Sequence, residues 1–262
     1  MLKKRLIPVL LLQNGLLVRS ELFKIHQVIG NPIHEVSRLN EWNVDELVYL
    51  DISLTDEYDL RREDHKIRNL THPLDILAAV SKTCFMPLTW GGRIRSVEDM
   101  RLRFSRGADK VTINSEGVRT PQLITDGAKA FGVQAIVVSI DAVRHPDGTR
   151  EVRIDGARTP TGLKPEEWAR QAEDRGAGEI LLQSIDRDGT GQGYDLDLIH
   201  AVASATTIPI IACSGVGRYE QYAEGIRAGA SAVAAANIWH FKELADRGGK
   251  RALSKAGIDV RV

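Results

Sequence analysis

The sequence predicts a single (β/α)₈ barrel, because eight short apolar segments alternate with helix signals and the second half of the chain repeats the first. The chain has 262 residues, of which 43% are hydrophobic and 27% charged. One barrel of this class has about that length, and the balance is ordinary for a globular protein with a large core. No linker or low-complexity tract divides the chain, so we expect one domain over residues 1–262.

Eight segments have the near-continuous apolar character of strands that are buried on both faces, as in a parallel sheet. In chain order they are 5–12, 46–53, 86–90, 110–114, 135–141, 179–185, 208–213 and 232–236. Proline marks the expected starts of four intervening helices, at Asn31-Pro32, His72-Pro73, Thr120-Pro121 and Lys164-Pro165. Glycine marks expected helix ends at Gly107, Gly132, Gly176 and Gly229.

An internal repeat distinguishes a closed barrel from a doubly wound sheet. The stretch from Pro87 to Gly107, a strand followed by glycine, a helix and Gly-Ala, recurs from Pro209 to Gly229, with an offset of 122 residues. The strands 5–12 and 135–141 also correspond, at an offset of 130. Two halves of four strands each close naturally into an eight-stranded barrel, whereas a doubly wound sheet has no reason to repeat in this way.

Composition excludes several classes of protein. Lys+Arg and Asp+Glu are both 35, so the basic excess typical of nucleic-acid binding is absent. The two cysteines, Cys84 and Cys213, indicate a reducing compartment without a disulfide framework. The apolar run after Arg5 is too short for a membrane span and has no cleavage site. We therefore expect a cytoplasmic protein with no membrane partner and no cofactor; histidines such as His65 and His72 show no metal-ligand spacing.

Two sets of residues follow predicted strands at equivalent places in the repeat. They are Gly91, Gly92, Asn114 and Ser115 in the first half, and Gly215, Val216, Ala236 and Asn237 in the second. Glycines let backbone N–H groups approach an anion, and the last two strands of this fold are a habitual phosphate site. Tight turns that merely need glycine are the alternative. Two related copies favour phosphate binding, and they imply a long ligand with a phosphate at each end.

Asp141 ends the strand 135–141, where side chains of a barrel carry function. This position favours a general acid or base, although the carboxylate could simply hold a loop. The repeat pairs Asp141 with Leu11, which cannot transfer a proton. The chain thus has one half of the opposed carboxylate pair that acid/base chemistry would use.

Other charged residues lie at both ends of the predicted strands. Asp188 and Gly189, in the loop 184–190, could contact a ligand or form an Asx turn that caps the next helix. Asp51 could orient a substrate or pair with Arg19. Four charges open or nearly open strands at the opposite end: Arg5, Glu46, Lys110 and Glu179. Spacing alone favours a salt-bridged plug for these four.

The chain resembles the cyclase subunit of imidazole glycerol phosphate synthase along nearly its whole length. The similar segments are 45–48, 50–52, 107–111, 140–142, 175–182 and 184–190. The resemblance implies a twofold-repeated barrel whose substrate carries two phosphates. It also implies a glutaminase subunit docked at the bottom of the barrel, near Asp109, from which ammonia passes along the axis. In that family Arg5, Glu46, Lys110 and Glu179 match a charged gate at the ammonia entrance.

The departures from that family are specific. Asp141 matches one of its two catalytic aspartates, but the other position is Leu11, and a lysine of the family is Arg19 here. Loss of one of the two acids should lower the catalytic rate about 10²–10⁴-fold. The leucine-rich first strand is similar to a paralogue branch tied to surface-polysaccharide synthesis, which delivers ammonia to a separate sugar amidotransferase.

Three hypotheses follow. The first, which the sequence favours, is a barrel that passes glutaminase-derived ammonia onward for amidination of an acetamido sugar. The second is an active cyclase of histidine biosynthesis, which forms imidazole glycerol phosphate and AICAR from PRFAR and ammonia with Asp141 and a displaced carboxylate such as Asp51. The third is a non-catalytic scaffold that activates a glutaminase, in which Asp141 would be dispensable.

Overall fold

A closed barrel of parallel strands forms the centre of the protein. The computed structural model describes residues 3–54, 58 and 72–261. Within these residues the barrel strands follow the order β1 (Arg5–Gln13), β4 (Leu47–Asp51), β5 (Leu88–Gly91), β6 (Lys110–Ile113), β7 (Ile136–Arg144), β10 (Glu179–Ser184), β11 (Ile210–Cys213) and β12 (Ala232–Ala235). Pairing of β12 with β1 and of β7 with β10 closes the ring. The (β/α)₈ prediction is confirmed, and each predicted strand segment overlaps one barrel strand.

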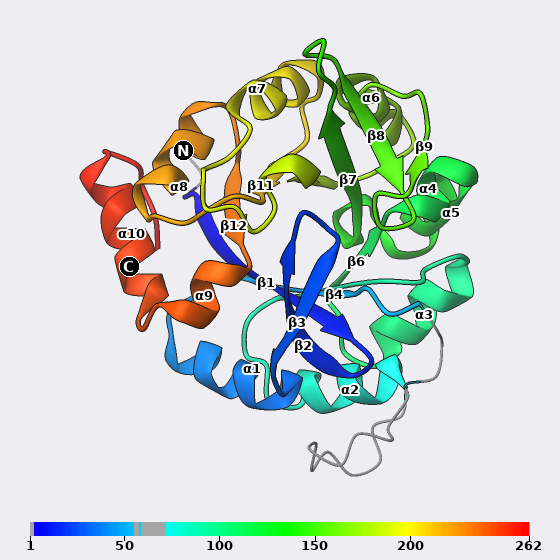
Figure 1. Cartoon of the computed structure of the whole chain (residues 1–262). Coiled ribbons are helices and arrows are strands. Elements are labelled where there is room, and N and C mark those ends of the chain that lie inside the picture. Colours follow the sequence, from blue (N-terminus) through cyan, green and yellow to red (C-terminus); the bar gives the residue numbers. More distant parts are fainter. Residues whose placement is uncertain (1–2, 55–57, 59–71, 262) are drawn as a thin grey trace.

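Helices surround the barrel on its outside (Figure 1). The longer ones are α1 (Pro32–Glu41), α2 (Pro73–Ser81), α3 (Val97–Ser105), α5 (Gln122–Phe131), α6 (Pro165–Asp174), α7 (Leu196–Ala205), α8 (Glu220–Arg227) and α10 (Ala245–Lys255). Proline stands in the first turn of α1, α2 and α6, as predicted, and the Asn31 side chain caps α1 by accepting from the Ile33 N–H at 2.9 Å. The four glycines predicted to end helices all have positive φ.

The internal repeat is visible in the short elements after two strands. Helix α4 (Ser115–Arg119) follows β6 and α9 (Asn237–Phe241) follows β12. Their first residues, Ser115 and Asn237, are separated by the same offset of 122 residues as the sequence repeat. Two 3₁₀ turns, η1 (Val133–Ala135) and η2 (Ile185–Arg187), complete the helical elements of the described residues.

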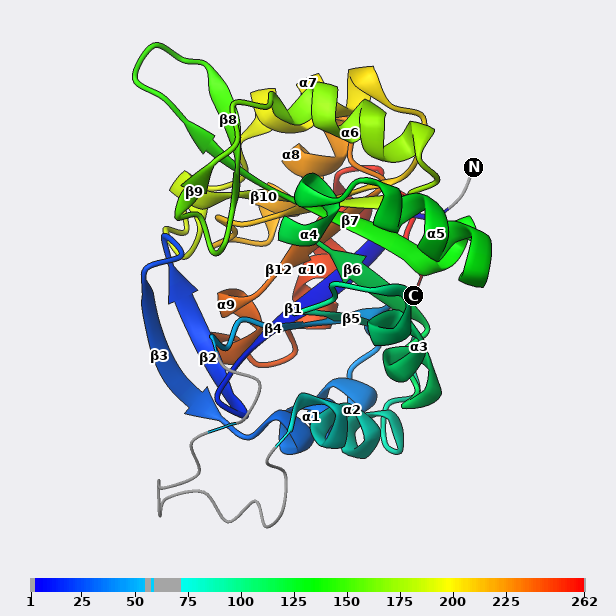
Figure 2. The same cartoon turned by 90° about the vertical axis from the view of Figure 1, so that its right-hand side faces the viewer.

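Two antiparallel hairpins extend the barrel beyond the carboxyl ends of its strands. Strands β2 (Leu16–Glu21) and β3 (Ile25–Gly30) extend β1, and β8 (Arg150–Ile154) with β9 (Thr159–Pro160) extends β7. Figure 2 shows both hairpins on one side of the barrel and the N-terminus on the other. Neither hairpin was predicted from the sequence.

The apolar core has two parts, one outside the barrel wall and one inside it. Most buried hydrophobic residues pack between strands and helices, and Trp90 belongs to this layer. Trp90 is fully buried and stacks on Tyr49, so it does not line the mouth of the barrel. A smaller cluster fills the barrel interior: Ile7, Val9, Leu11, Val18, Val48, Val137, Leu181, Ile211, Cys213, Ala232 and Ala234. No helix among the described residues is long and apolar enough to cross a membrane.

Candidate functional site at the mouth of the barrel

The carboxyl ends of the strands open into a cavity of about 1250 Å³. Each barrel strand or the turn directly after it contributes to its lining; the residues are Leu11, Asp51, Gly92, Thr112, Asp141, Gln183, Cys213 and Ala235. Pockets for compact ligands measure roughly 300–1,000 Å³. A cavity of this size has room for the long ligand that the repeat predicts.

Nearly all the residues predicted to contact ligand line this one cavity. They are Arg19, Asp51, Gly92, Asn114, Ser115, Asp141, Asp188, Gly189, Gly215, Val216, Ala236 and Asn237. Gly91 is not among the lining residues. A Cβ at Gly91 would lie 2.3 Å from the Thr112 side chain, so packing between neighbouring strands requires this glycine.

Asp141 lies buried at the floor of the cavity, between two side-chain amides. Asn114 Nδ2 donates to its Oδ2 and Gln183 Nε2 to its Oδ1, each at 2.9 Å. Burial raises the pKa of the Asp141 carboxyl to about 6, although these hydrogen bonds act in the opposite direction. A carboxyl group with such a pKa can both accept and donate a proton near neutral pH. The environment of Asp141 therefore suits a general acid or base.

Leu11 gives the cavity an apolar wall instead of a second carboxylate. Its side chain belongs to the interior cluster and is 8% exposed. Burial raises the pKa of the neighbouring Cys213 thiol to about 12, so this group also stays neutral. Of Leu11, Cys213 and Asp141, Asp141 alone has a pKa near neutrality.

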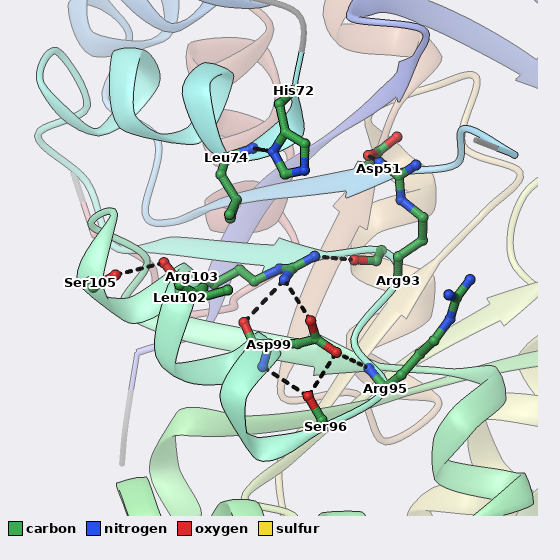
Figure 3. A network of polar contacts seen from close by, with 11 residues as sticks. Asp51, His72, Leu74, Arg93, Arg95, Ser96, Asp99, Leu102, Arg103 and Ser105 are labelled. Atoms are coloured by element: carbon green, nitrogen blue, oxygen red, sulfur yellow. Dashed lines mark hydrogen bonds and ion pairs between the residues drawn. The ribbon is translucent and has the colours of Figure 1, made fainter. Parts of the chain in front are cut away.

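Asp51 is engaged by its own neighbours. Its carboxylate forms an ion pair with Arg93, accepts from Tyr58 Oη at 3.1 Å, and accepts from Ser53 Oγ at 2.5 Å. Figure 3 shows Arg93 reaching toward Asp51. Of the two alternatives for Asp51, an ion pair with an arginine is present, but the partner is Arg93 and not Arg19.

Arg19 lies on the β2–β3 hairpin, and its side chain contacts Gln27 and Phe241. Its Nε donates to Gln27 at 2.5 Å, and its guanidinium lies 5.8 Å from the centre of the Phe241 ring. Arg19 still lines the cavity, near its rim.

The glycine turns allow neighbouring loops to approach closely. Gly92 has φ +111°, and a Cβ there would lie 2.3 Å from the Asp51 carbonyl oxygen. Gly215 has φ +91°, and its Cβ would lie 2.2 Å from the Gly193 carbonyl oxygen. Loop packing therefore requires glycine at both positions whether or not a phosphate binds beside them.

Asp188 holds the β2–β3 hairpin over the cavity. Its Oδ2 accepts from Ser20 Oγ at 2.6 Å and from the Phe23 N–H at 3.2 Å, and its carbonyl oxygen accepts from the Leu22 N–H at 3.0 Å. Burial raises the pKa of the Asp188 carboxyl. The structure thus gives Asp188 a role in positioning a wall of the site.

The four charges predicted at the strand starts meet at the opposite end of the barrel. Arg5 pairs with Glu46 at 2.6 Å and also with Glu179. Lys110 pairs with Glu46 at 3.1 Å and with Glu179 at 2.9 Å. Each cation therefore contacts both anions, and the resulting charged ring closes the barrel axis below the apolar interior cluster.

Sequence reasoning missed two features of the cavity. Gln183 could have been found from strand periodicity, because alternation from Glu179 through Leu181 places Gln183 on the inner face. Several arginines also line the cavity: Arg93, Arg95, Arg119, Arg153 and Arg158. They lie on loops, at the end of α4 and on the β8–β9 extension, where no strand pattern predicts their direction.

No group of three or more His, Cys, Asp or Glu side chains in the described part of the chain is arranged to hold a metal ion. His72 caps α2 by accepting from the Leu74 N–H at 3.2 Å. His65 lies outside the described residues.

Comparisons with known proteins agree with this architecture. A family model described as "Histidine biosynthesis protein" matches residues 5–245. The chain is also 41% identical over 261 residues to imidazole glycerol phosphate synthase subunit HisF of Gluconacetobacter diazotrophicus. That similarity covers 100% of this chain and 97% of the relative, so it includes both the cavity and the charged ring.

Proposed function

Because the chain belongs to the histidine biosynthesis protein family, we propose that it is the cyclase subunit of an imidazole glycerol phosphate synthase. In this role it uses ammonia to convert PRFAR, which carries two phosphates, into imidazole glycerol phosphate and AICAR. The observation that carries the proposal is the full-length similarity to a subunit of that name, together with a buried Asp141 at the cavity floor.

Asp141 is the proposed acid/base group. Its two amide partners, Asn114 and Gln183, fix the direction of the carboxylate, and its pKa of about 6 suits proton exchange at neutral pH. A carboxylate that only held a loop would accept from loop backbone. Asp141 instead accepts from side chains of residues that line the same cavity.

The two ends of the cavity are the proposed phosphate sites. Asn114 and Ser115 lie at one end and Ala236 and Asn237 at the other, related by the internal repeat. The large cavity between them supports a long ligand. The chain 1–262 would supply the whole site as one barrel domain.

A glutaminase subunit is the proposed source of ammonia, docked on the face of the barrel that carries the charged ring. The ring of Arg5, Glu46, Lys110 and Glu179 is closed by four ion pairs, so passage of ammonia requires at least one of them to open. Above the ring, the interior is lined by apolar side chains. Such a lining suits uncharged ammonia, because a bare ammonium ion would lose its hydration there.

Leu11 favours a second candidate function. With one acid absent, the barrel would bind the glutaminase and pass ammonia onward to a separate sugar amidotransferase, which would amidinate an acetamido sugar for polysaccharide synthesis. The phosphate-type loops would then hold a regulatory or remnant ligand.

One assay separates the two candidates. The purified barrel is mixed with its glutaminase and PRFAR, and imidazole glycerol phosphate is followed for the unmodified protein, Leu11→Asp and Leu11→Asn. Cyclase turnover by the unmodified protein supports the first candidate. Absence of turnover with glutaminase binding intact contradicts it and supports ammonia delivery. Leu11→Asn is the matched control, since asparagine is polar and has the size of aspartate but carries no carboxylate.

A further inference from the structure

We propose that Asp155 is an internal anion that competes with the ligand's phosphate for Arg119 at one end of the cavity. Both residues line the cavity, close to Ser115. The proposal rests on the proposed function in one respect only, namely that the ligand carries a phosphate at this end.

Arg119 already contacts an anionic group of the protein. Its Nη2 lies 2.6 Å from both Oδ1 and Oδ2 of Asp155. Arginine binds carboxylates and phosphates with the same arrangement of N–H donors. A phosphate that reaches Arg119 must therefore displace the Asp155 carboxylate or lie beside a like charge.

Every polar group of Asp155 is engaged. Its N–H donates to Ser115 Oγ at 2.9 Å, and its carbonyl oxygen accepts from Arg158 Nε at 2.7 Å. Thr159 Oγ1 donates to Oδ2 at 2.8 Å. These contacts fix Asp155 against the same segment, Ser115 to Arg119, that the repeat assigns to one phosphate end.

The backbone of this turn is strained in a way that these contacts compensate. Asp155, Gly156 and Ala157 have φ of +58°, +64° and +69°. Tight hairpin turns commonly use two such residues, whereas this turn has three in succession, two of them with side chains. Strain of this kind persists only where the surroundings hold it, and it often marks a functional site.

The carboxylate is charged at neutral pH. Burial acts to raise the pKa of Asp155, but hydrogen bonds from Thr159 and Arg119 outweigh it, and the net shift is downward. Asp155 therefore stays an anion under the conditions in which a phosphate ligand binds.

The competing pair belongs to one end of the cavity only. The repeat offset of 122 residues places Phe241 where Arg119 stands. The two ends thus differ at this position: one has an arginine held by Asp155, and the other has Phe241 with Arg19 beside it. In this proposal Asp155 weakens phosphate binding at the Arg119 end only. This asymmetry would set which end of a two-phosphate ligand enters each site.

Binding of inorganic phosphate tests the proposal without any turnover. Isothermal titration of the full chain at low salt compares the unmodified protein with Asp155→Asn. Asparagine tolerates positive φ and keeps an acceptor for Arg119, so the turn should persist. We expect binding to tighten about three- to tenfold, since both pair members are partly exposed and their interaction is screened. The gain should shrink at high salt.

Two controls assign the effect. Asp147→Asn removes the same charge from the tip of the same extension, at a residue that does not line the cavity. Arg119→Gln added to Asp155→Asn should abolish the gain. Unchanged, weaker or undetectable phosphate binding in a folded Asp155→Asn protein would overturn the proposal, as would an equal gain in Asp147→Asn. The phosphate titration involves no cyclase assay. Failure of this proposal can therefore be told apart from failure of the proposed function.

Discussion

Gln183 Nε2 donates a hydrogen bond of 2.9 Å to Oδ1 of Asp141 from the neighbouring barrel strand. This bond stabilises the ionised carboxyl group against the effect of burial. Gln183→Leu removes the donor and leaves Asn114 as the partner on the other oxygen. Because hydrogen bonds to charged groups contribute about 1.5–3 kcal/mol, the pKa of Asp141 should rise from about 6 to roughly 7 or above.

The measurement is the pH profile of kcat/KM, supported by NMR titration of the Asp141 carboxyl group. The acid limb should move to higher pH by about the same amount. Gln192→Leu, at an exposed glutamine outside the cavity lining, is the control. An unmoved Asp141 titration in Gln183→Leu would show that the hydrogen bond does not set this pKa.

The buried Asp141 carboxylate should also lower the free energy of unfolding at neutral pH. The pKa of Asp141 in the folded protein, about 6, lies above the ordinary value of 3.8. The folded state therefore binds the proton more tightly than the unfolded state. This contributes stability that is fully present below about pH 4 and is lost as the pH rises through 6. The difference corresponds to about 3 kcal/mol. Asp141→Asn should therefore abolish turnover yet raise the free energy of unfolding at pH 8 by about 2 kcal/mol, after allowance for one mismatched hydrogen bond.

Urea unfolding at pH 4 and pH 8 checks this expectation. The gain should be confined to the higher pH, because the unmodified carboxyl group is already neutral at pH 4. A loss of stability at pH 8 would mean that the site favours the charged form. Unchanged activation of the glutaminase by Asp141→Asn, with no cyclase turnover by the unmodified barrel, would instead support a scaffold role.

The barrel was predictable because its strands are buried on both faces and therefore read as apolar runs. The hairpins were missed although they carry signals. Asn14-Gly15 between two apolar runs is a strong hairpin-turn signal, and both residues have positive φ. Asp147-Gly148 separates β7 from β8 in a similar way. Each predicted strand stopped where its apolar run stopped, which concealed the hairpin strands that follow.

The composition of the site was less predictable than its location. Positions at strand ends identified Asp141 and the ring of four charges, since parallel strands bring equivalent positions together. The pairing of Asp51 with Arg93 depends on a φ of +52° at Arg93, after a glycine turn. Backbone geometry of that kind leaves no pattern in the sequence, so the partner of Asp51 could not be deduced.

Ser20→Ala should loosen the β2–β3 hairpin from the cavity. Ser20 Oγ donates to the buried Asp188 at 2.6 Å, and its loss leaves the carboxylate with the Phe23 N–H. An unsatisfied buried acceptor costs about 1–3 kcal/mol, which the hairpin can relieve by opening. Amide exchange at Leu22 and Phe23 should accelerate about tenfold or more.

Ser254→Ala, at an exposed serine of α10, should leave these two amides unchanged. The hairpin lines the cavity, so KM for a phosphorylated ligand should rise in Ser20→Ala with less effect on kcat. Unaltered exchange at Leu22 and Phe23 would contradict a holding role for Asp188.

Lys110→Met should destabilise the barrel far more than loss of a surface lysine. Lys110 neutralises both Glu46 and Glu179, whose side chains are 10% and 6% exposed. Its removal leaves Arg5 alone with two nearly buried carboxylates, which should cost about 3 kcal/mol in the free energy of unfolding. Lys164→Met breaks the exposed Lys164–Glu167 pair and should cost less than about 1 kcal/mol.

Urea unfolding of both variants gives the comparison. Equal, small losses would mean that the ring is solvated and does not close the barrel axis, and passage of ammonia would then need no gate there.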